Sequence, residues 1–181
     1  MTGNQQVGAA ARAATFTYGL VTYVLFFVTF CYAIGFVMDV AVPKSIDTGA
    51  PGPFWPSLAI NVALMGLFGI QHSVMARPEF KRVWTRIVPR PIERSTFVLA
   101  TCIVFALMFW QWRPMPAVVW DATQPVAAAA LTAVQFLGFG IVLLATIMIH
   151  HFDLFGMRQV YVYARGERYK ELGFRTPGFY K

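Results

Sequence analysis

Four long runs without charged side chains constrain this chain more than any other feature of its sequence. They cover residues 13–38, 57–76, 95–112 and 125–149. A helix needs roughly 20 residues to cross the hydrocarbon core of a bilayer, and each run has about that length. Because backbone groups in lipid must form their hydrogen bonds within their own segment, each run is predicted to be a helix.

The composition agrees with a membrane protein. Charged residues make up 13% of the chain, against about 25% in soluble domains. The prediction is an all-α fold, a polytopic membrane helix bundle with four transmembrane helices at about residues 15–38, 57–76, 95–112 and 125–149. We expect one integral-membrane domain over residues 1–181. The first run is too long for a cleavable signal peptide.

The basic residues are divided very unevenly between the two ends of the predicted helices. Every lysine and arginine except Lys44 and Arg113 lies before the first run, between the second and third, or after the fourth. Cytoplasmic segments carry such an excess, so both termini are predicted to be cytoplasmic. The net charge of +7 then faces anionic headgroups of the lipid bilayer, and nucleic acid is not an expected partner.

Two cytoplasmic segments have patterns of their own. Pro78 suits the first position of a helix, and it is followed at helical spacing by Phe80, Val83, Trp84 and Ile87. This predicts a short interfacial helix at about residues 78–88. The cytoplasmic tail, residues 152–181, is predicted to hold a short extended segment after Val160 and a turn at Gly166.

Polar side chains inside or beside the spans are candidate functional residues, because inserting them into a membrane costs free energy. In the second span, His72 shares a face with Asn61, and Gln71 is its neighbour. The fourth span has a polar face that consists of Thr132, Gln135, Thr146 and His150. Asp153 joins this face if the helix continues that far, whereas His151 points away unless the helix has already ended. The three histidines lie near the cytoplasmic ends of their spans.

These residues suit acid–base chemistry. A neutral imidazole is a general base near physiological pH, Asp153 can orient a histidine, and Arg158 can bind an anionic group. Alternatives are that His and Asp only cap helix carbonyls and anchor the span, that two histidines bind haem or a metal, and that the chain is a non-catalytic subunit of a larger membrane complex. We assign no metal ligand.

Four motifs resemble those of bacterial membrane methanethiol S-methyltransferases. They are QHSVMARPEFKRVW at 71–84, PIERSTFVL at 91–99, WRPMP at 112–116 and HFDLFGMRQ at 151–159. The wider group contains NnrU-like proteins and isoprenylcysteine carboxyl methyltransferases. The resemblance implies methyl transfer from S-adenosylmethionine to a small thiol, from methanethiol to dimethyl sulfide, at the bacterial cytoplasmic (inner) membrane. A homo-oligomer or a membrane-protein partner is compatible with it.

Candidate roles follow from the motifs and the chemistry together. We expect His72, His151 and Asp153 to be catalytic, because a thiol must lose its proton to become a good nucleophile. We expect the substrate or the cofactor to contact Gln71, Arg94, His150, Arg158 and Gln159. In the similar family a further segment with a Tyr-x-x-Arg-His-Pro motif follows. The sequence ends at Lys181, so we expect it to lack the family's C-terminal cofactor-binding part.

Overall fold

The computed structural model describes residues 8–118 and 120–172, and every regular element among them is a helix. In chain order these are α1 (Ala9–Met38), α2 (Phe54–Ala76), α3 (Pro78–Trp84), η1 (Arg90–Ile92), α4 (Glu93–Gln111), α5 (Pro125–Met148), α6 (His151–Leu154) and α7 (Met157–Ala164). Four helices, α1, α2, α4 with η1, and α5, are long and apolar enough to cross a membrane. The predicted all-α membrane fold is confirmed, and each predicted span differs from its helix only at the ends.

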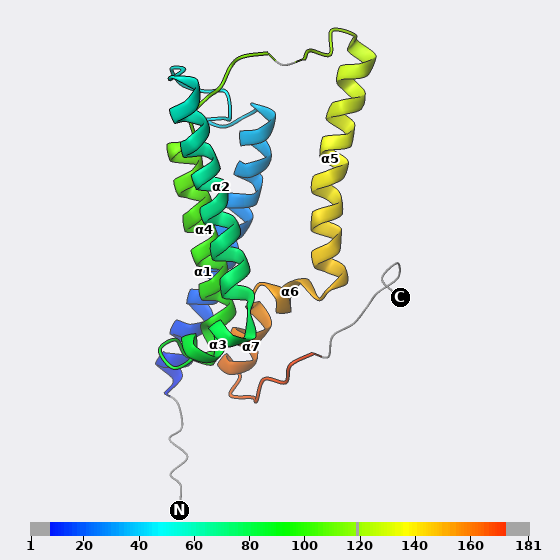
Figure 1. Cartoon of the computed structure of the whole chain (residues 1–181). Coiled ribbons are helices and arrows are strands. Elements are labelled where there is room, and N and C mark those ends of the chain that lie inside the picture. The colour runs from blue at the N-terminus through cyan, green and yellow to red at the C-terminus, as the bar shows by residue number, and fades with distance from the viewer. Residues whose placement is uncertain (1–7, 119, 173–181) are drawn as a thin grey trace, which may run out of the picture.

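Three of these four helices form a bundle. α4 packs against α1 on one side and against α2 on the other, and α5 stands apart from them (Figure 1). α5 has no buried residue, and its ring contact with the bundle joins Phe139 to Phe30 of α1, with centroids 6.1 Å apart. The short elements α3, α6 and α7 gather at the end of the bundle where α1 begins (Figure 1).

At the opposite end, a polar side chain fixes the linker that follows α4. Asn61 of α2 is 3% exposed. Its amide donates to the carbonyl of Arg113 at 2.8 Å, and its oxygen accepts the Arg113 N–H at 2.9 Å. A buried amide with both ends bonded stabilises the fold. Asn61 therefore joins α2 to the segment after α4, and it does not share a site with His72.

The interfacial helix is shorter than predicted. α3 ends at Trp84, and a turn at residues 85–87 with a bend at Val88 replaces the last part of the predicted helix 78–88. Pro89 follows directly, and a proline disfavours helical conformation in the residue before it. The chain therefore leaves the helical conformation before Pro89, and Ile87 lies outside α3.

The predicted extended segment after Val160 is wrong, because these residues belong to the helix α7. Alternating valines and tyrosines favour a strand in isolation, but packing decides otherwise. Val160 is 0% exposed and lies against Gly19 of α1, where an added Cβ would be 2.5 Å from its side chain. The predicted turn at Gly166 is present, with φ of 76°. Residues 173–181 of the predicted tail lie outside the described residues.

Candidate active site

The chain breaks its helix just where the polar residues begin. α5 ends at Met148, and His150 adopts a left-handed conformation with φ of 75°. The carbonyl of His150 then accepts the N–H groups of Asp153 and Leu154, at 2.9 and 3.0 Å, and starts α6. Because of this break, the direction of the His151 side chain is no longer set by the helical spacing of the fourth span. His150 thus contributes a turn of the backbone to the site.

His151 bridges two spans through both of its ring nitrogens. Its Nε2 lies 2.8 Å from the hydroxyl of Tyr23 in α1, and its Nδ1 lies 2.8 Å from the hydroxyl of Thr146 in α5. Had α5 continued, His151 would point away from Thr146. The bridge therefore depends on the break at His150.

The single proton of the Thr146 hydroxyl determines which nitrogen of His151 is the acceptor. The Thr146 hydroxyl donates to the carbonyl of Leu143 at 2.7 Å. A hydroxyl has one proton, so the Thr146 oxygen must accept a hydrogen bond from Nδ1–H. Burial lowers the pKa of His151, which favours the neutral ring. Nε2 is then the acceptor, and the Tyr23 hydroxyl donates to it.

Asp153 is the centre of a second cluster, two residues further on. Its side chain is buried, with the residue 7% exposed. One carboxylate oxygen lies 3.4 Å from Nη1 of Arg94, and the other lies 3.3 Å from Nη1 of Arg158. A buried carboxylate is tolerated when it is paired in this way. The structure therefore brings Arg94, Asp153 and Arg158 together, and the roles assigned to them stay predictions.

Tyr169 completes this cluster, and sequence reasoning missed it. Its hydroxyl donates to Asp153 at 2.7 Å, and its ring lies under the guanidinium of Arg158 at 5.2 Å. Gln159 is within hydrogen-bond distance of the same hydroxyl, at 3.2 Å. Burial, and after it the hydrogen bond to Asp153, raises the pKa of Tyr169 to about 12. The surrounding residues 165–172 are polar, and no spacing in them singles out this tyrosine.

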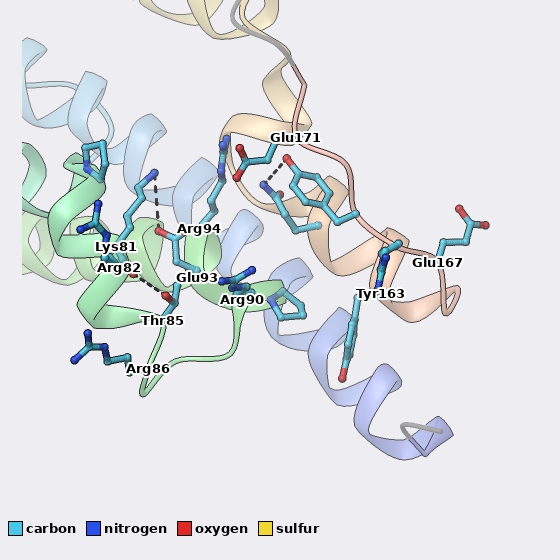
Figure 2. Close-up of a pocket in the computed structure, with 15 residues that line it drawn as sticks. Lys81, Arg82, Thr85, Arg86, Arg90, Glu93, Arg94, Tyr163, Glu167 and Glu171 are labelled. Carbon is cyan, nitrogen blue, oxygen red and sulfur yellow. Dashed lines mark hydrogen bonds and ion pairs between the residues drawn. The ribbon is translucent and has the colours of Figure 1, made fainter. Parts of the chain in front are cut away.

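A basic groove opens beside the Asp153 cluster. Its volume is about 950 Å³, and Arg94, Gln159 and Tyr169 form one part of its wall. Figure 2 shows the opposing walls, one from α3 and the segment up to the start of α4, the other from α7 and the chain that follows it. The basic side chains that line the groove are Lys81, Arg82, Arg86, Arg90, Arg94 and Arg168, and the acidic ones are Glu93, Glu167 and Glu171. The excess of positive charge suits an anionic group of a ligand.

His72 and Gln71 belong to a different contact. The ring of His72 packs between Phe68 and Phe97, with centroids 5.5 and 5.1 Å away. Gln71 donates to the sulfur of Met75 and accepts from Thr101 of α4, at 3.2 and 3.3 Å. Among the described residues, the hydrogen bonds and ion pairs connect neither of them to His151 or Asp153. A catalytic role for His72 stays a prediction.

Residues 8–118 and 120–172 contain no group of three or more His, Cys, Asp or Glu side chains arranged to hold a metal ion.

Comparison with known proteins gives several long matches. The chain is 50% identical over 94% of its length to a methanethiol S-methyltransferase of Mycobacterium tuberculosis, and covers 70% of that protein. It is 49% and 48% identical to methanethiol S-methyltransferases 2 and 1 of Bradyrhizobium diazoefficiens, over 94% and 92% of its length, and covers 66% and 58% of them. No family model matches the chain, and no solved structure matches it.

Proposed function

Because the chain belongs to the family of methanethiol S-methyltransferases, we propose that it transfers a methyl group from S-adenosylmethionine to a small thiol. Methanethiol is the substrate we propose, and dimethyl sulfide the product. The observation that carries the proposal is the 50% identity over 94% of the chain. We place the reaction on the cytoplasmic side of the inner membrane, because the basic groove, α6 and α7 share the end that carries the excess of lysine and arginine.

The groove beside Asp153 fits the methyl donor in size and charge. Pockets for small molecules measure about 300–1,000 Å³, and this groove measures about 950 Å³. S-adenosylmethionine has a carboxylate and an ammonium group, which suit the arginines and glutamates of the two walls. Arg90 and Arg94 would hold the carboxylate, and Gln159 would position Tyr169 at the end of the groove. When bound, the donor supplies a methyl group on a positively charged sulfur.

The network around His151 supplies the base that a thiol requires. An alkyl thiol is mostly protonated at neutral pH, and the thiolate is the nucleophile. The neutral His151 ring has one acceptor nitrogen and is held by Tyr23 and Thr146. Asp153 is two residues away, but its charge is already balanced by Arg94 and Arg158. We therefore assign the base to His151 and give Asp153 a positioning role.

Methyl transfer by the purified chain tests the proposal. We expect dimethyl sulfide to form in the headspace from methanethiol and S-adenosylmethionine, detected by gas chromatography. Arg90→Gln should raise the KM for the donor by about 10-fold, the value of one charge-assisted hydrogen bond. The matched control is Arg113→Gln, since Arg113 lies at the other end of the bundle and bonds Asn61 through its backbone.

The same preparation separates an enzyme from a non-catalytic subunit. Calorimetric titration with S-adenosylmethionine should give heat of binding for the unmodified protein and weaker binding for Arg90→Gln. An unmodified protein that neither binds the donor nor forms dimethyl sulfide would refute the proposal and favour a non-catalytic role.

A further inference from the structure

The single acceptor nitrogen of His151 is not open to a substrate. Because the Thr146 proton is donated to Leu143, we assign the ring proton to Nδ1, which lies 2.8 Å from Thr146, and the acceptor role to Nε2, which lies 2.8 Å from the Tyr23 hydroxyl. While Tyr23 stays in place, a proton can reach Nε2 only from the Tyr23 oxygen. A thiol that loses its proton to His151 must therefore lose it through this tyrosine.

We propose that Tyr23 is a catalytic residue that takes the proton from the thiol and passes its own proton to His151, and that the thiol arrives through an apolar cavity between α1 and α5. This inference rests on the proposed thiol methylation and names the atom that first receives the proton.

The surroundings of Tyr23 are apolar, which suits such a transfer. Its ring is half-buried and lies about the same distance from three phenylalanines, with centroids 6.2 Å from Phe26, 6.0 Å from Phe152 and 6.2 Å from Phe155. His151 meets the Tyr23 ring edge-on at 5.7 Å. Hydrogen bonds in such a low-dielectric site are stronger than in water, so the hydroxyl stays directed at Nε2.

The cavity offers a route for a small apolar thiol. It measures about 590 Å³ and is lined by one face of α1 from Phe27 to Met38, by residues 40–42, and by Phe136 of α5. Phe27 follows Tyr23 by one helical turn and so lies on the same face of α1. Tyr23 itself does not line the cavity, and such an apolar route would admit a neutral thiol from lipid but not a thiolate. The thiol therefore arrives protonated and needs the relay.

The transfer balances in protons and electrons. The S–H proton moves to the Tyr23 oxygen while the Tyr23 proton moves to Nε2, so His151 becomes an imidazolium ion that donates to Tyr23 and Thr146. The thiolate sulfur then forms a bond to the donor's methyl carbon, and the bond from that carbon to the sulfonium sulfur breaks with its electron pair going to that sulfur. The imidazolium finally releases its proton to cytoplasmic water.

The other titratable groups around the relay do not replace it. Cys102 of α4 packs in the same apolar cluster as Tyr23, but a thiol there has no hydrogen bond to His151 among the described residues. Asp153 of α6 is bonded to Arg94 of α4 and Arg158 of α7. α5 contributes the hydroxyl of Thr146, which does not titrate near neutral pH.

Tyr23→Phe tests the proposal through the acidity of the substrate. At neutral pH we expect kcat/KM for methanethiol to fall by about 10²–10⁴-fold, the usual value of general base catalysis. The deficit should shrink as pH rises, and for the more acidic trifluoroethanethiol, because the thiol proton is then lost more easily without the tyrosine. The ratio between the two thiols is measured within one variant, so any loss of folded protein cancels. Tyr18→Phe is the matched control, since Tyr18 is also on α1 and its hydroxyl is hydrogen-bonded to another side chain, that of Thr96 of α4, at 3.1 Å.

The experiment distinguishes a catalytic role of Tyr23 from a structural role and from failure of the proposed function. A deficit that is the same at every pH and for both thiols indicates a structural role and overturns the proposal, as does the absence of any deficit. If the unmodified protein methylates neither thiol, the proposed function itself fails. If the unmodified protein methylates both thiols, and Tyr23→Phe selectively loses activity on the less acidic thiol, Tyr23 is the proton acceptor.

Discussion

At the scale of single residues, Asp153 sets the charge balance at the end of the bundle where α6 and α7 lie. One buried carboxylate holds two arginines that come from different helices, Arg94 from α4 and Arg158 from α7. Removing one member of a buried pair costs more free energy than the pair contributes, because the remaining charge is left without a partner. Asp153 therefore joins α4, α6 and α7 and shapes one end of the basic groove.

Tyr169 should give this cluster a measurable pH dependence. Its pKa is raised to about 12 from an ordinary 10.0, so the folded protein favours the neutral hydroxyl. The resulting stabilisation is complete below the ordinary pKa and is lost as pH rises through the raised one. We expect Tyr169→Phe to lower the free energy of unfolding by about 1 kcal/mol at pH 8, and the difference from the unmodified protein to narrow above pH 10. Thermal unfolding in detergent across this range measures it.

The control for this prediction is Tyr161→Phe, because Tyr161 is 50% exposed and interacts with Arg165 at the surface. It should change stability little at any pH. A difference for Tyr169→Phe that stays constant from pH 8 to pH 11 would contradict the assignment.

Sequence reasoning predicted part of the candidate site and missed Tyr23 and Tyr169 for a physical reason. Arg94, Asp153 and Arg158 stand out as charges beside apolar spans, and the structure does bring them together. Tyr23 and His151 are 128 residues apart, and neither a motif nor a helical period relates them. The direction of His151 depends on a left-handed residue at His150, and no glycine or proline marks that break.

At the scale of elements, the packing of α7 on α1 holds the Asp153 cluster in place. Gly19 allows this contact, since an added Cβ would lie 2.5 and 2.8 Å from the methyl groups of Val160. Such an overlap forces a helix to move. The same contact explains why residues 160–163 are helical despite a pattern of valines and tyrosines. α7 begins directly after Gly156, and its helical turn brings the Val160 side chain against α1.

Gly19→Ala should therefore lower the free energy of unfolding by about 1–3 kcal/mol, the usual cost of overpacking. Val160→Ala in the same chain should restore part of it, because the two side chains are in contact and their effects are coupled. Gly66→Ala is the matched control, since nothing lies within 4 Å of its added Cβ and alanine favours a helix by about 1 kcal/mol over glycine. Thermal unfolding of the variants in one detergent compares them. Equal stability of Gly19→Ala and Gly66→Ala would show that α1 and α7 do not pack this closely.

At the scale of the whole molecule, the helices fall into a packed bundle of α1, α2 and α4 and a separate α5 (Figure 1). Hydropathy predicts the bundle helices and the separate α5 equally well, because the preference of a helix for lipid does not depend on its neighbours. It does not tell which helices pack together. The bridge from Thr146 through His151 to Tyr23 joins the C-terminal end of α5 to the bundle, so the proposed base lies where the two parts meet.

The predicted orientation of this assembly in the membrane rests on charge alone and can be tested directly. Asp47 and Arg86 are exposed at opposite ends of the bundle, and the excess of basic residues predicts a cytoplasmic location for Arg86. In a Cys31→Ser chain, Asp47→Cys should react with a membrane-impermeant maleimide in right-side-out vesicles, and Arg86→Cys only in inside-out ones. The remaining Cys102 is buried and serves as the unreactive background. The reverse labelling pattern would place the basic groove outside the cell, away from cytoplasmic S-adenosylmethionine, and would refute the proposed location of the reaction.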